Sequence, residues 1–184
     1  TEALAMTLRR FSDPISERGK NLIAAIEKQS IEKQERLATL ESDAVRGDPR
    51  KGKELFQSGK GTCIACHRIA DNGGTIGPDL SHIGQIRNQR DLLESILFPD
   101  ASIARGYETF QVETKDGKVL QGTLPPEDAS ALPLVLPDGT LNSLRHEDVL
   151  RVDPIATSLM PTGLDRLLER QELADLASYI LSLR

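Results

Sequence analysis

The sequence predicts a mainly α-helical fold, which a small antiparallel β module interrupts and an N-terminal helical extension precedes. Helix-start signals and apolar residues at near-helical spacing occur at both ends of the chain. Between residues 105 and 154 the pattern changes to short strand-like runs joined by Asp-Gly turns. We therefore expect an extension at 1–47 and a helical domain at 48–184 with a β insertion at 105–154.

The composition narrows the classes of function. Apolar residues make up 38% and aromatic residues 3% of the 184 residues, and there is no Trp. This is lean for a large core, so a buried prosthetic group would help to fill one. The net charge of −5 argues against a nucleic-acid partner.

The sequence contains no run of about 18 apolar residues, so it predicts no membrane span. The chain begins at Thr1, which suggests a processed or excised protein whose export signal is gone.

Two helices are expected before the cysteines. The first begins at Asp13-Pro14, where Asp is the N-cap and Pro takes the first helical position, and it ends at Gly47. We expect this helix to pack on its own domain, and the alternatives are a connection to a larger parent protein and a dimer contact. Asp48-Pro49 begins the second helix, which ends at Ser58-Gly59.

Two further helices are expected after the cysteines. One runs from Asn88 to Phe98 and is ended by Pro99. The last one begins at Thr162, with Asp165 three residues later in an arrangement close to a capping box.

The β module is expected to contain two hairpins and a closing strand. The run "YETFQVETKDGKVLQGTL" predicts two strands with a turn at Asp116-Gly117, and "LPLVLPDGTLNSL" predicts two more with a turn at Asp138-Gly139. A fifth strand follows in "EDVLRV". This number of short strands indicates a small barrel or a curled sheet.

Both cysteines of the chain lie in the pentad Cys63-Ile64-Ala65-Cys66-His67. C-x-x-C-H is the attachment signature of c-type haem, in which the two thiols add across the porphyrin vinyl groups and the histidine binds the iron. A thioredoxin-like dithiol would need a βαβ context, which the neighbouring sequence lacks. A zinc site could recruit the same residues together with His82, and a strained disulfide is a further alternative. The pentad alone leaves these chemistries open.

The residues around the pentad resemble class I cytochromes c. Gly52 and Phe56 in "GKELF" match the glycine and aromatic residue of that family's N-terminal helix, and Leu176 and Tyr179 in "LASYI" match its C-terminal helix. "GPDL" at Gly77 to Leu80 matches the loop after the haem motif, and "SLMP" at Ser158 to Pro161 matches the methionine loop. The resemblance implies one covalently attached haem c and a pair of terminal helices that cross.

The resemblance also implies an iron site. The thioether links would come from Cys63 and Cys66, and His67 would be the proximal ligand, with its Nδ1 bonded to the carbonyl of Pro78. Met160 is the expected sixth ligand. His82 and His146 are the rivals for that position. In addition, the long β insertion just before the methionine loop could reposition that loop.

A bacterial group within this family matches more of the chain. The runs "GPDLSHIG", "LLESILFPDASIARGYETFQVETKDGKVLQG" and "SLMPTGL" resemble the C-terminal haem-binding domains of large multidomain, dehydrogenase-like proteins from planctomycetes and verrucomicrobia. The resemblance runs from about Asp48 onward. It implies that the N-terminal helix connects to preceding domains.

The predicted function is one-electron transfer by a mono-haem, iron-binding c-type cytochrome domain, with no catalytic residues of its own. The donor would be a fused or docking dehydrogenase, the acceptor another cytochrome or an oxidase, and the compartment the periplasm. The first alternative is a haem-based sensor or small-ligand-binding module with a displaceable Met160. A peroxidase is disfavoured because di-haem peroxidases need a second C-x-x-C-H pentad, which the sequence lacks.

Overall fold

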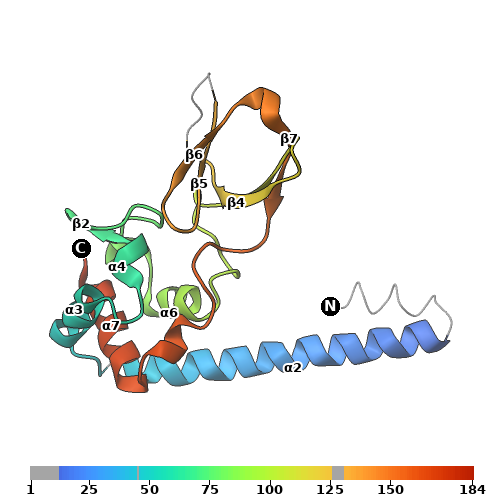
Figure 1. The fold of residues 1–184 in the computed structure, drawn as a ribbon. Coiled ribbons are helices and arrows are strands. Elements are labelled where there is room, and N and C mark those ends of the chain that lie inside the picture. The colour runs from blue at the N-terminus through green and yellow to red at the C-terminus, as the bar shows by residue number, and fades with distance from the viewer. Residues whose placement is uncertain (1–12, 45, 126–130) are drawn as a thin grey trace. The chain divides into compact units, whose positions relative to one another are not determined.

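The computed structural model describes residues 13–44, 46–125 and 131–184 (Figure 1). The chain forms two compact units, Thr1–Thr39 and Leu40–Arg184. The expected boundary at residue 47 stays a prediction. Among the described residues, no helix is both long enough and apolar enough to cross a membrane.

The described part of the first unit lies in helix α2 (Asp13–Ala44), whose last residues belong to the second unit. The helix begins at the predicted Asp-Pro pair. Its side chains are mostly exposed, including Leu22, Ile26 and Ile31. Met6 and the other residues before Asp13 lie outside the described residues.

The second unit is built on helices α3 (Pro49–Ser58), α6 (Gln89–Leu97) and α7 (Arg170–Ser182). The predicted signals for α3 are confirmed, because the Asp48 side chain accepts a hydrogen bond from the Arg50 N–H and Gly59 ends the helix with a φ of 76°. Asn88 likewise caps α6. These helices supply buried residues to one core: Phe56, Leu92, Leu93, Ile96, Leu97, Leu173, Leu176, Ala177, Tyr179 and Ile180.

Helices α3 and α7 cross at a glycine. A Cβ added to Gly52 would lie 2.0 Å from the carbonyl oxygen of Asp175 and 2.7 Å from the Cβ of Tyr179. The ring of Phe56 meets that of Tyr179 edge-on at a centroid distance of 6.1 Å. The buried Asp175 carboxylate accepts hydrogen bonds from the Asp48 N–H and the Gln171 side chain. The positions in α3 and α7 that resemble the two terminal helices of cytochromes c therefore meet, as the resemblance implies.

The prediction that the last helix begins at Thr162 is wrong. Gly163 takes the left-handed region with a φ of 85°, and a 3₁₀ turn, η2 (Leu164–Leu167), precedes α7. The capping box lies later, because the Glu169 side chain caps α7 and the Glu172 side chain returns a hydrogen bond to the Glu169 N–H.

The β insertion is a five-stranded antiparallel sheet in the order β6-β5-β4-β3-β7 (Figure 1). Its strands are β3 (Thr109–Thr114), β4 (Val119–Thr123), β5 (Leu132–Val135), β6 (Leu141–Leu144) and β7 (Val149–Ile155). Strand β7 follows a 3₁₀ turn, η1 (His146–Asp148). The first and last strands of the sheet in chain order, β3 and β7, pair with each other. Thr109 lies opposite Ile155, and the register shifts at Glu113/Thr114.

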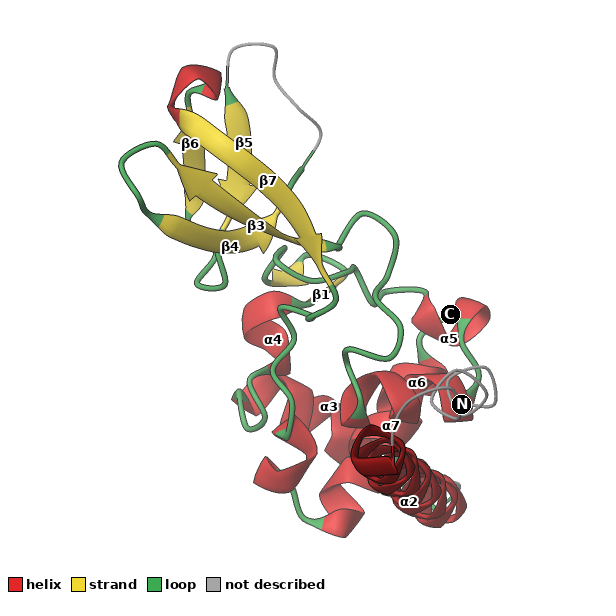
Figure 2. Cartoon of the chain, turned by 90° about the vertical axis from the view of Figure 1, so that its right-hand side faces the viewer, coloured by secondary structure: helices red, strands yellow, loops and turns green. Residues whose placement is uncertain are grey.

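The sheet has its own hydrophobic cluster. Val112, Leu132 and Leu134 are buried at its centre, and five half-buried residues pack against them: Leu120, Leu124, Leu136, Leu144 and Val149. Helix accounts for 46% and strand for 19% of the structure, so the description as mainly α is only partly confirmed. In Figure 2 the start of β3 and the end of β7 meet at the end of the sheet nearest the helices.

Candidate haem site

The two cysteines lie on a single helical turn, α4 (Cys63–Cys66). A spacing of three residues places their thiols on one side of that turn. Neither cysteine forms a disulfide, and the Cys63 thiol is 3.6 Å from the carbonyl oxygen of Gly61. Burial raises the pKa of both thiols, which keeps them in the protonated form.

His67 follows the turn directly, and one of its ring nitrogens is occupied. Its Nδ1 donates to the carbonyl oxygen of Pro78 at 2.9 Å. This bond assigns the ring proton to Nδ1 and leaves the Nε2 lone pair for a metal. Burial lowers the pKa of His67, although the bond to Pro78 opposes that shift, so the ring is held neutral. The structure thus contains the hydrogen bond that the family resemblance implies.

The glycine-rich loop packs its backbone directly against the pentad. A Cβ on Gly77 would lie 2.7 Å from Cε1 of His67, and one on Gly74 would lie 1.9 Å from the carbonyl oxygen of Ala65. The backbone N–H groups of these glycines donate to Cys66 and Ile64. The loop includes a short hairpin of β1 (Arg68–Ile69) and β2 (Asn72–Gly73). These glycines therefore allow the loop to lie flat on the turn that holds the thiols.

A polar network fixes the segment that carries Pro78. The Asp79 carboxylate accepts from the Arg68 guanidinium at 2.8 Å and from the Ser81 N–H at 2.8 Å. The Ser81 hydroxyl accepts from the Ala70 N–H at 2.7 Å. Hydrogen bonds from Ser81 and Arg68 hold the pKa of Asp79 well below its usual range. These hydrogen bonds join the backbone that follows His67 to the backbone that follows Pro78.

Met160 reaches the same space from the chain that leaves the sheet. It follows β7 by five residues and is half buried. Its N–H donates to the Ser158 hydroxyl at 3.1 Å, and the Ser158 N–H donates to the Asp100 carboxylate at 2.7 Å. The loop is therefore attached both to the sheet and to the segment after α6.

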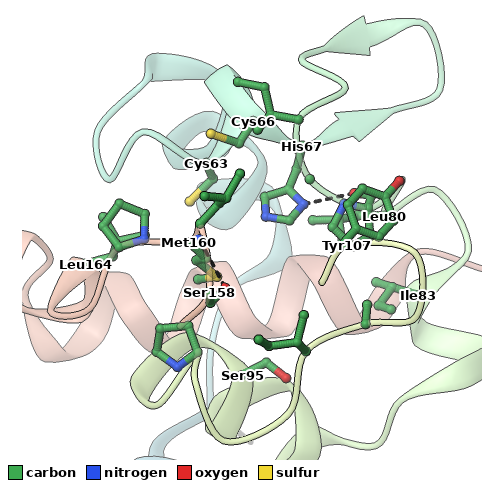
Figure 3. A pocket seen from close by; sticks show the side chains of 18 of the residues that line it. Cys63, Cys66, His67, Leu80, Ile83, Ser95, Tyr107, Ser158, Met160 and Leu164 are labelled. Atoms are coloured by element: carbon green, nitrogen blue, oxygen red, sulfur yellow. Dashed lines mark hydrogen bonds between the residues drawn. The ribbon is translucent and has the colours of Figure 1, made fainter. Parts of the chain in front are cut away.

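These groups surround one cavity of about 190 Å³ (Figure 3). Cys63, Cys66, His67 and Met160 all line it. Most of the rest of the lining is apolar: Ile76, Gly77, Pro78, Leu80, Ile83, Leu92, Pro99, Ile103, Ala104, Leu159, Pro161 and Leu164. Free thiols beside an imidazole with an available Nε2, in a largely apolar cavity, fit a covalently held haem.

The inserted sheet contributes to the cavity as well. Thr123 of β4 lines it, and Tyr107 does so just before β3. The turn between β5 and β6 lies against a lining residue, because a Cβ on Gly139 would be 3.2 Å from Cδ1 of Ile76. The insertion therefore forms part of the wall.

The histidine rivals for the sixth position lie elsewhere. His82, just before the short helix α5 (Ile83–Ile86), and His146, in η1, are exposed, and neither lines the cavity. The Arg145 guanidinium pairs with Glu147 and Asp148 beside His146, as expected of a solvated turn. Within the described residues, no three His, Cys, Asp or Glu side chains gather as metal ligands.

Sequence reasoning missed several lining residues: Arg87, Ser95, Ser102, Tyr107 and Thr123. Arg87 follows the one-turn helix α5, for which the sequence carries no cap signal. The sequence predicts a strand from Tyr107, whereas β3 begins two residues later. Only the tertiary fold brings these side chains to the cavity.

Comparison with known proteins agrees with this site. A search of curated proteins found no match. Residues 49–133 match a family model described as Cytochrome c, and this segment contains the pentad, Pro78 and the first strands of the sheet. Cytochrome c domains hold haem c covalently, and Cys63 and Cys66 are compatible with a single C-x-x-C-H site. Residues 49–133 are therefore similar to cytochrome c domains, and the two cysteines fit one covalently attached haem c.

Proposed function

We propose that this chain transfers single electrons through one haem c held between His67 and Met160. The observation that carries the proposal is the shared cavity, which two free thiols, an oriented imidazole and a thioether all line. When bound, haem c supplies a one-electron couple between ferric and ferrous iron. Cys63 and Cys66 hold it in place, and His67 presents Nε2.

Met160 is the proposed second axial ligand. A thioether ligand raises the reduction potential relative to histidine alone. With both axial positions taken by protein side chains, the site has no open coordination position for a substrate, so we infer an electron-transfer domain rather than an enzyme.

The position of Arg87 supports a haem in this cavity. Among the residues that line the cavity, it carries the only charged side chain, and no hydrogen bond or ion pair is formed by its guanidinium within the described residues. A half-buried cation beside an apolar wall is costly unless an anion meets it. The two propionates of haem are anions of this kind.

The finer parts of the proposal concern partners. We infer a dehydrogenase as donor, fused or docking, and another cytochrome or an oxidase as acceptor. The resemblance to the haem-binding domains of large dehydrogenase-like proteins supports this assignment, and covalent haem attachment supports a periplasmic location. The exposed Leu22, Ile26 and Ile31 of α2 support a contact between two copies through this helix.

Absorption spectra of protein made with c-haem maturation machinery test the function. We expect sharp c-type bands after reduction and a weak far-red sulfur-to-iron band in the oxidised protein. Met160→Ala should remove the far-red band and keep the haem attached. Met6→Ala, a change at the chain's other methionine, is the control and should keep both.

Two results would count against the proposal. A far-red band that persists in Met160→Ala would reject Met160 as the ligand. Prompt binding of carbon monoxide by the reduced wild-type protein would favour the sensor alternative, because it would indicate a displaceable distal ligand.

A further inference from the structure

We propose that Asp100 is a positioning residue for Met160, which it holds at the cavity through Ser158. The inference rests on the proposed function, because it takes Met160 as the distal ligand. It adds a residue outside the cavity that controls how readily the distal position opens. Asp100 is exposed and does not line the cavity, so its role is exerted through the loop it binds.

Asp100 stands on a rigid support. It follows α6, whose Leu93, Ile96 and Leu97 are buried in the helical core. Pro99 is buried and lines the cavity, and the Ala101 N–H donates to the Phe98 carbonyl at 2.8 Å in a tight turn around Asp100. The carboxylate therefore projects from a fixed point beside the site.

The methionine loop has few other restraints. Of the described residues 156–162, only two form hydrogen bonds, and these are the bonds from the Ser158 N–H to Asp100 and from the Met160 N–H to the Ser158 hydroxyl. A hydrogen bond to an ionised carboxylate is shorter and stronger than one between neutral groups. The relay from Asp100 through Ser158 thus fixes the backbone of Met160.

The same bond closes the base of the insertion. Asp100 and Ser158 are 58 residues apart in the sequence, and the segment between them contains the whole sheet. Within that segment Thr109 of β3 pairs with Ile155 of β7. The strand ladder and the Asp100–Ser158 bond therefore hold the entering and leaving chains at neighbouring points. Breaking the bond leaves the ladder as the remaining hydrogen-bonded restraint on the loop.

The test measures how strongly imidazole displaces the distal ligand of the oxidised holoprotein. Asp100→Ala should weaken the far-red band and raise imidazole affinity about tenfold, since about 1.4 kcal/mol, the size of a charge-assisted bond, is tenfold in an equilibrium constant. Asp100→Asn keeps an amide oxygen that accepts the Ser158 N–H, so its affinity should lie within about twofold of wild type.

Asp116→Ala is the matched control. This carboxylate also belongs to an exposed turn, where it accepts from Thr114 and pairs with Lys118, and it does not line the cavity. It should leave imidazole affinity unchanged. Equal imidazole affinity in Asp100→Ala and Asp116→Ala would overturn the proposal and reduce Asp100 to a structural residue.

Ser158→Ala is a second test of the proposal, to be used if the Asp100→Ala protein does not acquire its haem. It keeps the Ser158 N–H and removes the acceptor of the Met160 N–H, so imidazole affinity should rise about threefold for the loss of a neutral hydrogen bond. An unchanged affinity would contradict the relay. Failure of the proposed function is distinct, because the wild-type protein would then lack the far-red band or Met160→Ala would keep it.

Discussion

The two sides of the site are built in different ways. On the proximal side, His67 and its acceptor Pro78 are 11 residues apart, and Gly77 packs on the ring. On the proposed distal side, Met160 comes 93 residues after His67 in the sequence, and its loop follows the inserted sheet and is bonded to Asp100 through Ser158. The proximal side is thus held by local contacts and the distal side by long-range ones. The distal side should therefore be the easier one to disrupt.

The strongest test of this difference removes a side chain from the sheet core. Leu134 is fully buried among the residues packed around Val112, so Leu134→Ala should cost about 3 kcal/mol of unfolding free energy. The far-red band should weaken because the sheet positions the Met160 loop, while the haem stays attached. Denaturant unfolding and absorption spectra measure the two effects.

Leu150→Ala is the control for that experiment, because Leu150 is 60% exposed on β7. Its effect on stability should be close to zero. If Leu134→Ala lost the attached haem together with the far-red band, the two sides would not be separable.

The next test breaks the helical framework instead. Gly52→Ala places a Cβ 2.0 Å from the backbone oxygen of Asp175, so helices α3 and α7 must separate. We expect a loss of about 2 kcal/mol, typical of overpacking, with both sides of the site affected. Thermal unfolding of the holoprotein measures it, and Lys53→Ala at the exposed neighbouring position is the control. A variant as stable as wild type would show that the crossing is not tight.

The same difference explains what the sequence could predict. Cys63, Cys66, His67 and Pro78 lie within 16 consecutive residues, so a local motif was enough to place them together. The strands of the insertion were also predictable, because Asp-Gly turns and alternation are local signals. The start of the last helix was not, since Gly163 turns the chain before a capping box at Glu169 that the pattern did not favour.

The remaining wall residues needed the tertiary fold. Arg87, Tyr107 and Thr123 belong to three different segments, and no spacing relates them to the pentad. Asp100 showed no signal at all, because its partner Ser158 lies beyond the sheet. Local sequence therefore predicts the proximal side, and long-range packing decides the distal one.

A smaller effect is expected from crowding the proximal ring. Gly77→Ala adds a Cβ 2.7 Å from Cε1 and 2.9 Å from Nδ1 of His67, so the ring must shift and its bond to Pro78 must lengthen. We expect a loss of about 1 kcal/mol from that bond and a changed reduction potential, with the far-red band retained. Potentiometry measures the change, and Thr75→Ala, an exposed position in the same loop, is the control. An unchanged potential would show that ring position does not tune the site.

The smallest effect concerns Asp79, which holds the segment after Pro78. Its pKa is lowered by hydrogen bonds from Ser81 and Arg68, so the charged form is the one that stabilises the fold. The contribution is therefore present above the ordinary pKa of about 4 and is lost as the pH falls toward the lowered value. Denaturant unfolding should show wild type more stable than Asp79→Asn at pH 7, and this difference should shrink steadily below about pH 4. A difference that stayed constant down to pH 2 would mean that the carboxylate acts through its shape alone. Because the bonded groups are exposed, salt should reduce the difference, which separates this charged restraint from the buried contacts at Gly77.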